Sequence, residues 1–214
     1  MWIKNHIHEK FYQKAKEEGF RARSAFKLLH ILRKYPILDV NGQFAHKVLD
    51  LGCSPGSWIE VVMRKYQDFQ ESNQVNIPPP KILGIDLTSI RPFPEFPTVS
   101  FERIDIFTPE CEAKIKEWSK GKLDVILSDL APKTGGNDTD VRIQEAMVLR
   151  VFELANFFLR PGGHVAIKVF QSEETQRIIA EWKTKFELLK PFKPQASQPQ
   201  SRELFLVGMN FLNT

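Results

Sequence analysis

The chain has 214 residues, of which 42% are hydrophobic and 26% are charged, and its formal net charge is +4. These values are typical of one ordinary soluble globular domain, and the lack of a long apolar run argues against a membrane span or a secretion signal. Two cysteines, Cys53 and Cys111, are too few for a disulfide framework or a zinc cluster, so we expect reduced thiols, no metal and a cytoplasmic location.

Positive charge is concentrated at the N-terminal end of the chain. Residues 1–47 contain ten lysines and arginines but only four acidic residues, which leaves +6 on this segment and −2 on the remainder. A basic segment on a near-neutral body predicts a surface that binds a polyanion. The alternative is that these residues form the solvated face of a helix.

Two short helices are predicted within this basic segment. The first spans residues 7–18 and is closed by Gly19, and the second follows Ser24, a candidate N-cap, and ends at Pro36. Lys27 lies near the border of the second helix's apolar stripe. That stripe consists of Ala25, Leu28, Leu29 and Leu32.

The centre of the sequence contains a short strand, a glycine turn and the start of a helix. Residues 48–51 are predicted to form a buried strand and residues 52–56 a tight turn, and Ser57 is a candidate cap for the helix that begins at Trp58. Such an arrangement brings backbone close to a ligand at the carboxyl end of the strand, although it also occurs in ordinary strand-to-helix connections.

Acidic residues follow the next three predicted strands. Asp86 ends the strand at residues 81–86, Asp105 follows residues 99–104, and Asp129 follows residues 123–127. In a nucleoside-binding α/β fold, an acid at this edge accepts hydrogen bonds from ribose hydroxyls. The glycine spacing matches neither a P-loop nor a dinucleotide turn. A nucleoside without a phosphate chain fits better, and S-adenosylmethionine is the obvious candidate.

The remaining segments complete an alternation of strands and helices. Helices are predicted at residues 109–119, over a long segment ended by residues 161–163, and at 173–184; strands at 164–170, 187–189 and 204–208; and loops at 68–80, 91–97, 133–138 and 191–199. This alternation predicts an α/β fold with a mostly parallel, doubly wound sheet and helices on both faces.

Lys168 is an unusual residue for its predicted position. It lies within an otherwise apolar strand, where an unpaired lysine is costly and has a lowered pKa. The side chain could simply emerge at an exposed end of the strand. Otherwise Asp129 and Glu203 are candidates to supply countercharges at the same edge of the sheet.

Five motifs in order carry a family resemblance. They are residues 19–28, 50–58, 128–132, 161–171 and 201–203. Together they resemble the FtsJ-like RNA 2′-O-ribose methyltransferases, most closely the members that act on large-subunit ribosomal RNA, over about residues 10 to 210. The departures from the family's pattern are Cys53, Ser54, Lys133 and the long segment 68–80, of which Lys133 puts the detail of the substrate-side loop in doubt.

The resemblance implies a Rossmann-like, S-adenosylmethionine-dependent methyltransferase fold and a catalytic Lys-Asp-Lys-Glu set. In this sequence the catalytic set is Lys27, Asp129, Lys168 and Glu203. Together with the glycine turn, the expected cofactor-binding set is Gly52, Ser54, Pro55, Gly56, Trp58, Asp86, Asp105 and Asp129.

The expected activity is therefore 2′-O-methylation of a ribose, that of a uridine, in ribosomal RNA or a large-subunit particle. We expect a monomeric, single-domain enzyme, with residues 1–46 as a basic helical RNA-binding extension of a catalytic core at 47–214. A transfer RNA ribose methyltransferase of the same family would share all of these residues. A base N-methyltransferase would need no such catalytic set, and the intact set argues against a non-catalytic RNA-binding assembly factor.

Overall fold

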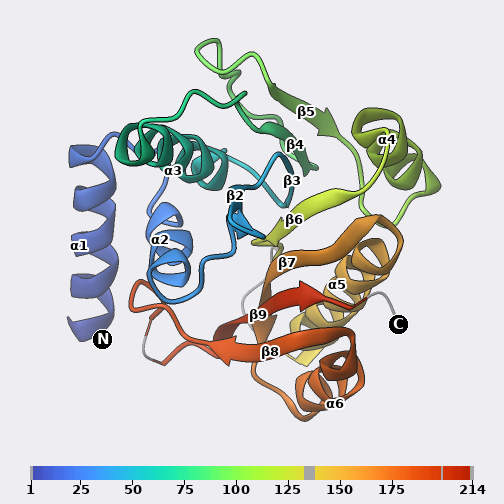
Figure 1. Cartoon of the computed structure of the whole chain (residues 1–214). Helices are drawn as coiled ribbons and strands as arrows, with labels where there is room; N and C mark the ends of the chain where they lie inside the picture. The colour runs from blue at the N-terminus through green and yellow to red at the C-terminus, as the bar shows by residue number, and fades with distance from the viewer. Residues whose placement is uncertain (1, 133–137, 199, 213–214) are drawn as a thin grey trace.

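The computed structural model describes residues 2–132, 138–198 and 200–212, which are built around a seven-stranded sheet (Figure 1). Its parallel strands are β3 (Lys47–Leu51), β4 (Lys81–Asp86), β5 (Val99–Arg103), β6 (Leu123–Ser128) and β7 (Leu159–Phe170). The strands β8 (Phe186–Phe192) and β9 (Glu203–Phe211) are antiparallel to their neighbours. The order β5-β4-β3-β6-β7-β9-β8 confirms the mostly parallel α/β fold.

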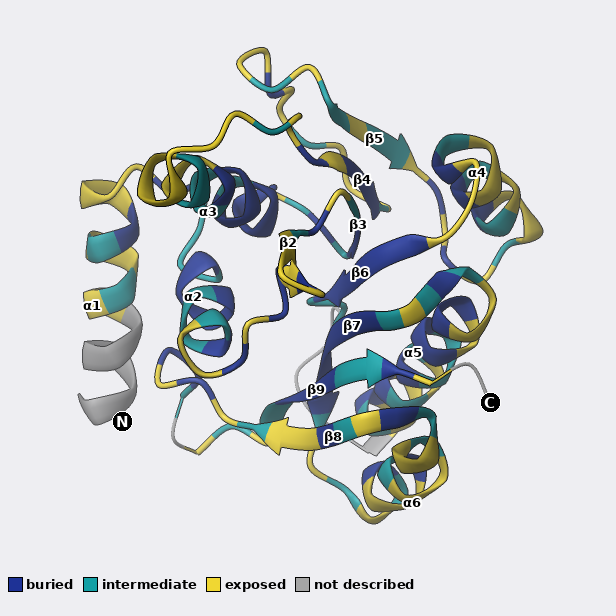
Figure 2. Cartoon of the chain, in the orientation of Figure 1, coloured by how far each residue is buried: buried dark blue, intermediate teal, exposed yellow. Residues whose placement is uncertain are grey.

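Helices cover both faces of the sheet. They are α1 (Trp2–Glu17), α2 (Ala25–Lys34) and α3 (Ser57–Asn73) on one face, and α4 (Pro109–Ser119), α5 (Asp138–Phe158) and α6 (Glu173–Trp182) on the other. Neighbouring strand residues alternate between the two layers: Val48 packs in the first apolar cluster and Leu49 in the second. The central strands β3 and β6 are therefore buried on both sides, whereas the edge strands β5 and β8 carry exposed residues (Figure 2). No helix in the described ranges is long and apolar enough to cross a membrane.

Several predicted boundaries were wrong. Helix α3 continues to Asn73, so residues 68–73 are helical and not part of a loop; their polar side chains form the outer face of the last turns. Helix α1 begins at Trp2, earlier than residue 7. Strand β7 begins at Leu159, earlier than the predicted residue 164, so the Pro161 motif lies within this strand; α5 ends before it, at Phe158.

The C-terminal strands are longer than predicted. Strand β8 extends through Pro191, which is tolerated because β8 lies at the edge of the sheet.

A short hairpin, β1 (Asp39–Val40) and β2 (Gln43–Phe44), surrounds the Asn41–Gly42 turn. The predicted loop at 133–138 and Lys133 lie outside the residues that the structure describes, apart from the helical start at residue 138.

The order of strands creates a crevice next to β3. The chain moves from β3 outward through β4 to β5 and then returns to place β6 on the other side of β3. Ligands of open α/β sheets bind at such a switch point, outside the carboxyl ends of the strands. Here those ends carry the glycine turn after β3 and Asp129 after β6.

Candidate active site

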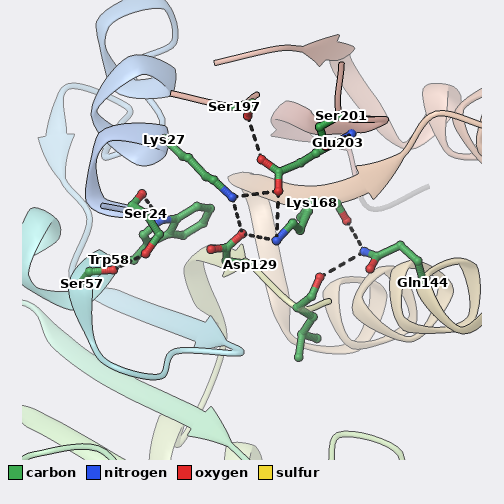
Figure 3. Close-up of polar contacts among 11 residues, drawn as sticks. Ser24, Lys27, Ser57, Trp58, Asp129, Gln144, Lys168, Ser197, Ser201 and Glu203 are labelled. Carbon is green, nitrogen blue, oxygen red and sulfur yellow. Dashed lines mark hydrogen bonds and ion pairs between the residues drawn. The ribbon is translucent and has the colours of Figure 1, made fainter. Parts of the chain in front are cut away.

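Four charged side chains from distant parts of the chain meet at this edge of the sheet (Figure 3). The Nζ of Lys168 lies 2.9 Å from Asp129 Oδ1 and 3.2 Å from Glu203 Oε2. The Nζ of Lys27 lies 2.8 Å from Glu203 Oε2 and 3.8 Å from Asp129 Oδ1. The structure thus brings together all four residues of the predicted catalytic set, as two ammonium groups bridged by two carboxylates.

Lys168 is buried within the sheet and does not emerge at an exposed strand end. Only 7% of the residue is exposed, and its backbone is in register with Phe205 of β9. Lys27 is 8% exposed because its neighbours on α2, Phe26 and Leu28, pack into the core. Both ammonium groups therefore depend on the carboxylates for the interactions that water would otherwise supply.

Two supporting residues were missed from the sequence. The hydroxyl of Ser197 donates a hydrogen bond to Glu203 Oε1 (2.7 Å), and the amide of Gln144 donates to the carbonyls of Lys168 (2.8 Å) and Leu130 (3.2 Å). Gln144 is buried at an apolar-stripe position of α5, four residues before Val148, and that placement was an available signal. Ser197 lies in a polar, proline-rich segment that carries no such signal.

The charges of the cluster follow from a competition between burial and attraction. Burial lowers the pKa of Lys168, but the nearby carboxylates of Asp129 and Glu203 outweigh it and raise the pKa above its ordinary value. Burial raises the pKa of Glu203, but Lys168, Lys27 and the hydrogen bonds from Lys27 and Ser197 lower it to about 2. At neutral pH Lys168 is therefore an ammonium and Glu203 a carboxylate.

Glu203→Gln is expected to remove a pH-dependent part of the stability. Because the pKa of Glu203 falls from 4.5 to about 2 on folding, its stabilisation is fully present above pH 4.5 and is lost as the pH falls toward 2. The wild type should be more stable than the variant at pH 7 by on the order of 2–3 kcal/mol, and this difference should shrink below pH 4.5. Urea unfolding of both proteins across this pH range tests the prediction, and the variant Glu181→Gln, at an exposed glutamate, is the control. A difference in unfolding free energy that does not change with pH would contradict the prediction.

A cavity of about 540 Å³ adjoins the charged cluster through Asp129. Five residues of the expected cofactor-binding set line it, namely Gly52, Ser54, Asp86, Asp105 and Asp129. Its apolar walls include Ile85, Ile106, Leu130 and Met147. The volume lies within the range of about 300–1,000 Å³ usual for small-molecule sites, and apolar walls with a few acids suit a nucleoside.

The turn between β3 and α3 shapes this cavity. Asp86 Oδ2 accepts a hydrogen bond from the backbone N–H of Ser54 (3.0 Å), and Oδ1 accepts one from that of Thr88 (2.7 Å). Gly52 has φ +74°, and a Cβ on it would lie 3.0 Å from the backbone nitrogen of Leu130. A larger residue at this position would therefore displace the segment that carries Asp129.

The other expected cofactor-binding residues, Pro55, Gly56 and Trp58, do not line this cavity. The ring of Trp58 is buried 5.6 Å from that of Phe205, and its Nε1 donates to the carbonyl of Ser24 (2.9 Å). Trp58 thus packs against the sheet on the side of Lys27.

One of the two predicted serine caps was wrong. Ser24 occupies the N-cap position of α2 as predicted, although its side chain makes no cap hydrogen bond. Gly56 and not Ser57 occupies the N-cap position of α3, and Ser57 is the first helical residue. The hydroxyls of Ser24 and Ser57 lie 2.6 Å apart and bond to each other. They join the N-terminal segment to α3.

Asp50 of β3 is a further acid close to the site. It is fully buried, and neither carboxyl oxygen has a hydrogen-bond partner among the described residues. Burial first, and then the charges of Asp129 and Asp86, raise its pKa well above the ordinary value. These surroundings favour the neutral carboxyl over a further negative charge at this edge of the sheet.

Comparison with known proteins identifies the family. The profile of the FtsJ-like methyltransferases matches residues 20–211. The chain belongs to the FtsJ-like methyltransferase family. This methyltransferase is 34% identical to ribosomal RNA large subunit methyltransferase E of Rickettsia bellii over 210 residues, which are 98% of this chain and 87% of that protein. It is 33% identical to the protein of the same name from Myxococcus xanthus over 200 residues, or 93% of this chain and 87% of that one.

A solved structure supports the same assignment. The crystal structure of a protein described as a ribosomal RNA methyltransferase from Plasmodium falciparum superimposes with a TM-score of 0.74 and 29% identity. The match covers 90% of this chain and 99% of that one. The Rossmann-like methyltransferase fold and the resemblance found in the sequence motifs are confirmed.

Proposed function

We propose that this methyltransferase transfers the methyl group of S-adenosylmethionine to a ribose 2′-hydroxyl, that of a uridine, in large-subunit ribosomal RNA, and works as a cytoplasmic monomer. The observation that carries the proposal is the position of Asp129, which lines the cavity and also lies 2.9 Å from the ammonium of Lys168. The cavity and the charged cluster thus share a wall, as a cofactor and an acceptor hydroxyl require. The names of the relatives support ribosomal RNA as the substrate.

The chain's residues suit this reaction as follows. When bound, S-adenosylmethionine supplies an electrophilic methyl group. Lys168, held as an ammonium, cannot accept the hydroxyl proton; it donates a hydrogen bond to the ribose oxygen and orients the oxygen's lone pair. As the oxygen gains the methyl group, its proton must leave, and Asp129 is the carboxylate that borders both the cavity and the lysines. Glu203, whose pKa is lowered to about 2, is a poor base and holds both lysines in place.

The RNA is proposed to bind along the basic N-terminal segment. Lys10 and Lys14 lie one turn apart on α1, and Lys34 ends α2, the helix that carries Lys27. The rings of Phe11 and Phe26, 5.3 Å apart, hold α1 against α2. Phosphates bound here would lie on the helix layer that delivers Lys27 to the site.

The test is methyl transfer to purified RNA, followed by mapping of the modified nucleotide. The protein should transfer labelled methyl from S-adenosylmethionine to the 2′-oxygen of a uridine in large-subunit ribosomal RNA or a large-subunit particle. Transfer RNA and base-methylation products are the comparison arms. Label found on a base, or on transfer RNA alone, would contradict the proposal.

A further inference from the structure

All three guanidinium nitrogens of Arg21 contact other groups of the protein, although the position of Arg21 in the basic segment suggested a phosphate contact. Its NH1 donates to the carbonyls of Arg91 (2.6 Å) and Pro55 (3.3 Å), and its NH2 donates to the carbonyl of Pro92 (2.9 Å). The guanidinium carbon lies 3.5 Å from the centre of the Phe93 ring. All three guanidinium nitrogens are engaged, since Nε faces a carboxylate of α3.

That carboxylate belongs to Glu60. Its Oε1 lies 3.2 Å from Arg21 Nε, and its Oε2 accepts the backbone N–H of Arg21 (2.8 Å). The side chains of Arg21 and Glu60 are only 18% and 14% exposed. A phosphate would have to compete with this ion pair and three backbone carbonyls for the same guanidinium.

The contacts of Arg21 join two segments that wall the cofactor cavity. Pro55 belongs to the glycine turn, directly after Ser54, which lines the cavity. Arg91 and Pro92 belong to the connection that follows β4, whose first residues, Leu87 and Thr88, also line it. At the cavity wall the glycine turn also meets the end of β4, directly before this connection, through the hydrogen bond from the backbone N–H of Ser54 to Asp86. Arg21 is a second tie between them, on the outside.

The glycine turn is built to admit this tie. Gly56 has φ +103°, and a Cβ on it would lie 2.7 Å from the Phe93 ring and 3.1 Å from Arg21 NH1. Glycine is therefore required for the guanidinium and the ring to reach the turn. This packing gives Gly56 a role outside the cavity.

We infer that Arg21 is a positioning residue for cofactor binding, which sets the spacing of the glycine turn and the connection after β4, and that it is not a phosphate ligand. The inference rests on the proposed cofactor. Arg21 would also link the cofactor cavity to the basic N-terminal segment, because the chain continues from Arg21 through Arg23 and Ser24 into α2.

The experiment measures S-adenosylmethionine affinity by calorimetry, without RNA, for wild type, Arg21→Lys and Arg23→Gln. A lysine keeps the charge but cannot bind several carbonyls and a carboxylate in one plane. We therefore expect Arg21→Lys to lower the affinity for S-adenosylmethionine by about 10- to 100-fold. Arg23→Gln should leave cofactor affinity unchanged. Wild-type affinity in Arg21→Lys would overturn the inference, whereas failure of the wild type to bind would count against the proposed function itself.

RNA binding across a salt series separates the two roles of the arginines. Arg21→Gln should keep the wild-type slope of log affinity against log salt. Arg23 belongs to the basic N-terminal segment proposed to bind RNA, so Arg23→Gln should reduce that slope by about 0.7–0.9. A reduced slope in Arg21→Gln would assign Arg21 to phosphate and overturn the inference. Phe93→Leu is a second variant, for the case that the Arg21 variants misfold. It removes the ring above the guanidinium but leaves every hydrogen bond of Arg21, and it should weaken cofactor binding in a protein that still melts as a folded domain. Unchanged affinity in Phe93→Leu would also contradict the inference.

Discussion

Replacing Lys168 with methionine is expected to lower the single-turnover rate of methyl transfer by about 10²–10⁴-fold. The ammonium is the only group of the cluster that reaches both carboxylates from within the sheet, at 2.9 and 3.2 Å. Methionine keeps the aliphatic stem but donates no hydrogen bond, so a ribose oxygen would lose its orienting partner. S-adenosylmethionine affinity should change little, because Lys168 does not line the cavity.

The same substitution should also lower the melting temperature. It leaves the carboxylates of Asp129 and Glu203 with Lys27 as their remaining cation, and breaking a buried ion pair in this way typically costs about 3–5 kcal/mol. Lys190→Met is the matched control, since Lys190 is exposed on β8, the edge strand of the same sheet. Near-normal transfer by a folded Lys168→Met that binds cofactor would remove Lys168 from the reaction.

Sequence reasoning predicted the sheet because its strands are buried on both faces. Residues 48–51, 82–85 and 123–127 are mostly apolar, with Asp50 and Asp124 as their only charged residues, and they are bounded by turns or charges. This is the pattern of parallel strands under two helix layers. It failed where tertiary contact overrides local pattern. The polar end of α3 forms a helix because Phe69 packs against Phe44 (5.6 Å), a residue 25 positions away.

The candidate site also has a part that the sequence predicts and a part that it does not. Lys168 was predictable from its surroundings, because a lysine within an apolar strand is rare. The full set of four charged residues was predictable only from the resemblance of the motifs to the family. The contacts that support the site were not predictable, although the position of Gln144 on α5 was itself a signal. Gln144, Ser197 and Arg21 act largely on backbone carbonyls or on one carboxylate, up to 71 positions away in the chain. Any residue supplies a carbonyl, so sequence carries no trace of those pairings.

Asp129→Asn is expected to affect both halves of the site. Asp129 lines the cavity and faces both lysines, so the amide should weaken cofactor binding and also lower the transfer rate at saturating cofactor by about 10²-fold or more. Asp105→Asn is the matched comparison, because Asp105 lines the cavity but makes no ion pair with either lysine. Asp105→Asn should weaken cofactor binding and leave the transfer rate at saturating cofactor unchanged.

The pH dependence of the Asp129→Asn rate distinguishes an orienting lysine from a basic one. Asp129 is the first of the carboxylates that raise the pKa of Lys168, so its neutralisation should bring that pKa down toward or below the ordinary 10.5. If the ammonium is the active form, activity is present below the pKa and lost as the pH rises through it. The alkaline fall in rate should then begin at a lower pH in Asp129→Asn than in the wild type. A single-turnover rate that instead rises with pH through this range in the variant would mean that the neutral amine is active, and would assign the role of base to Lys168.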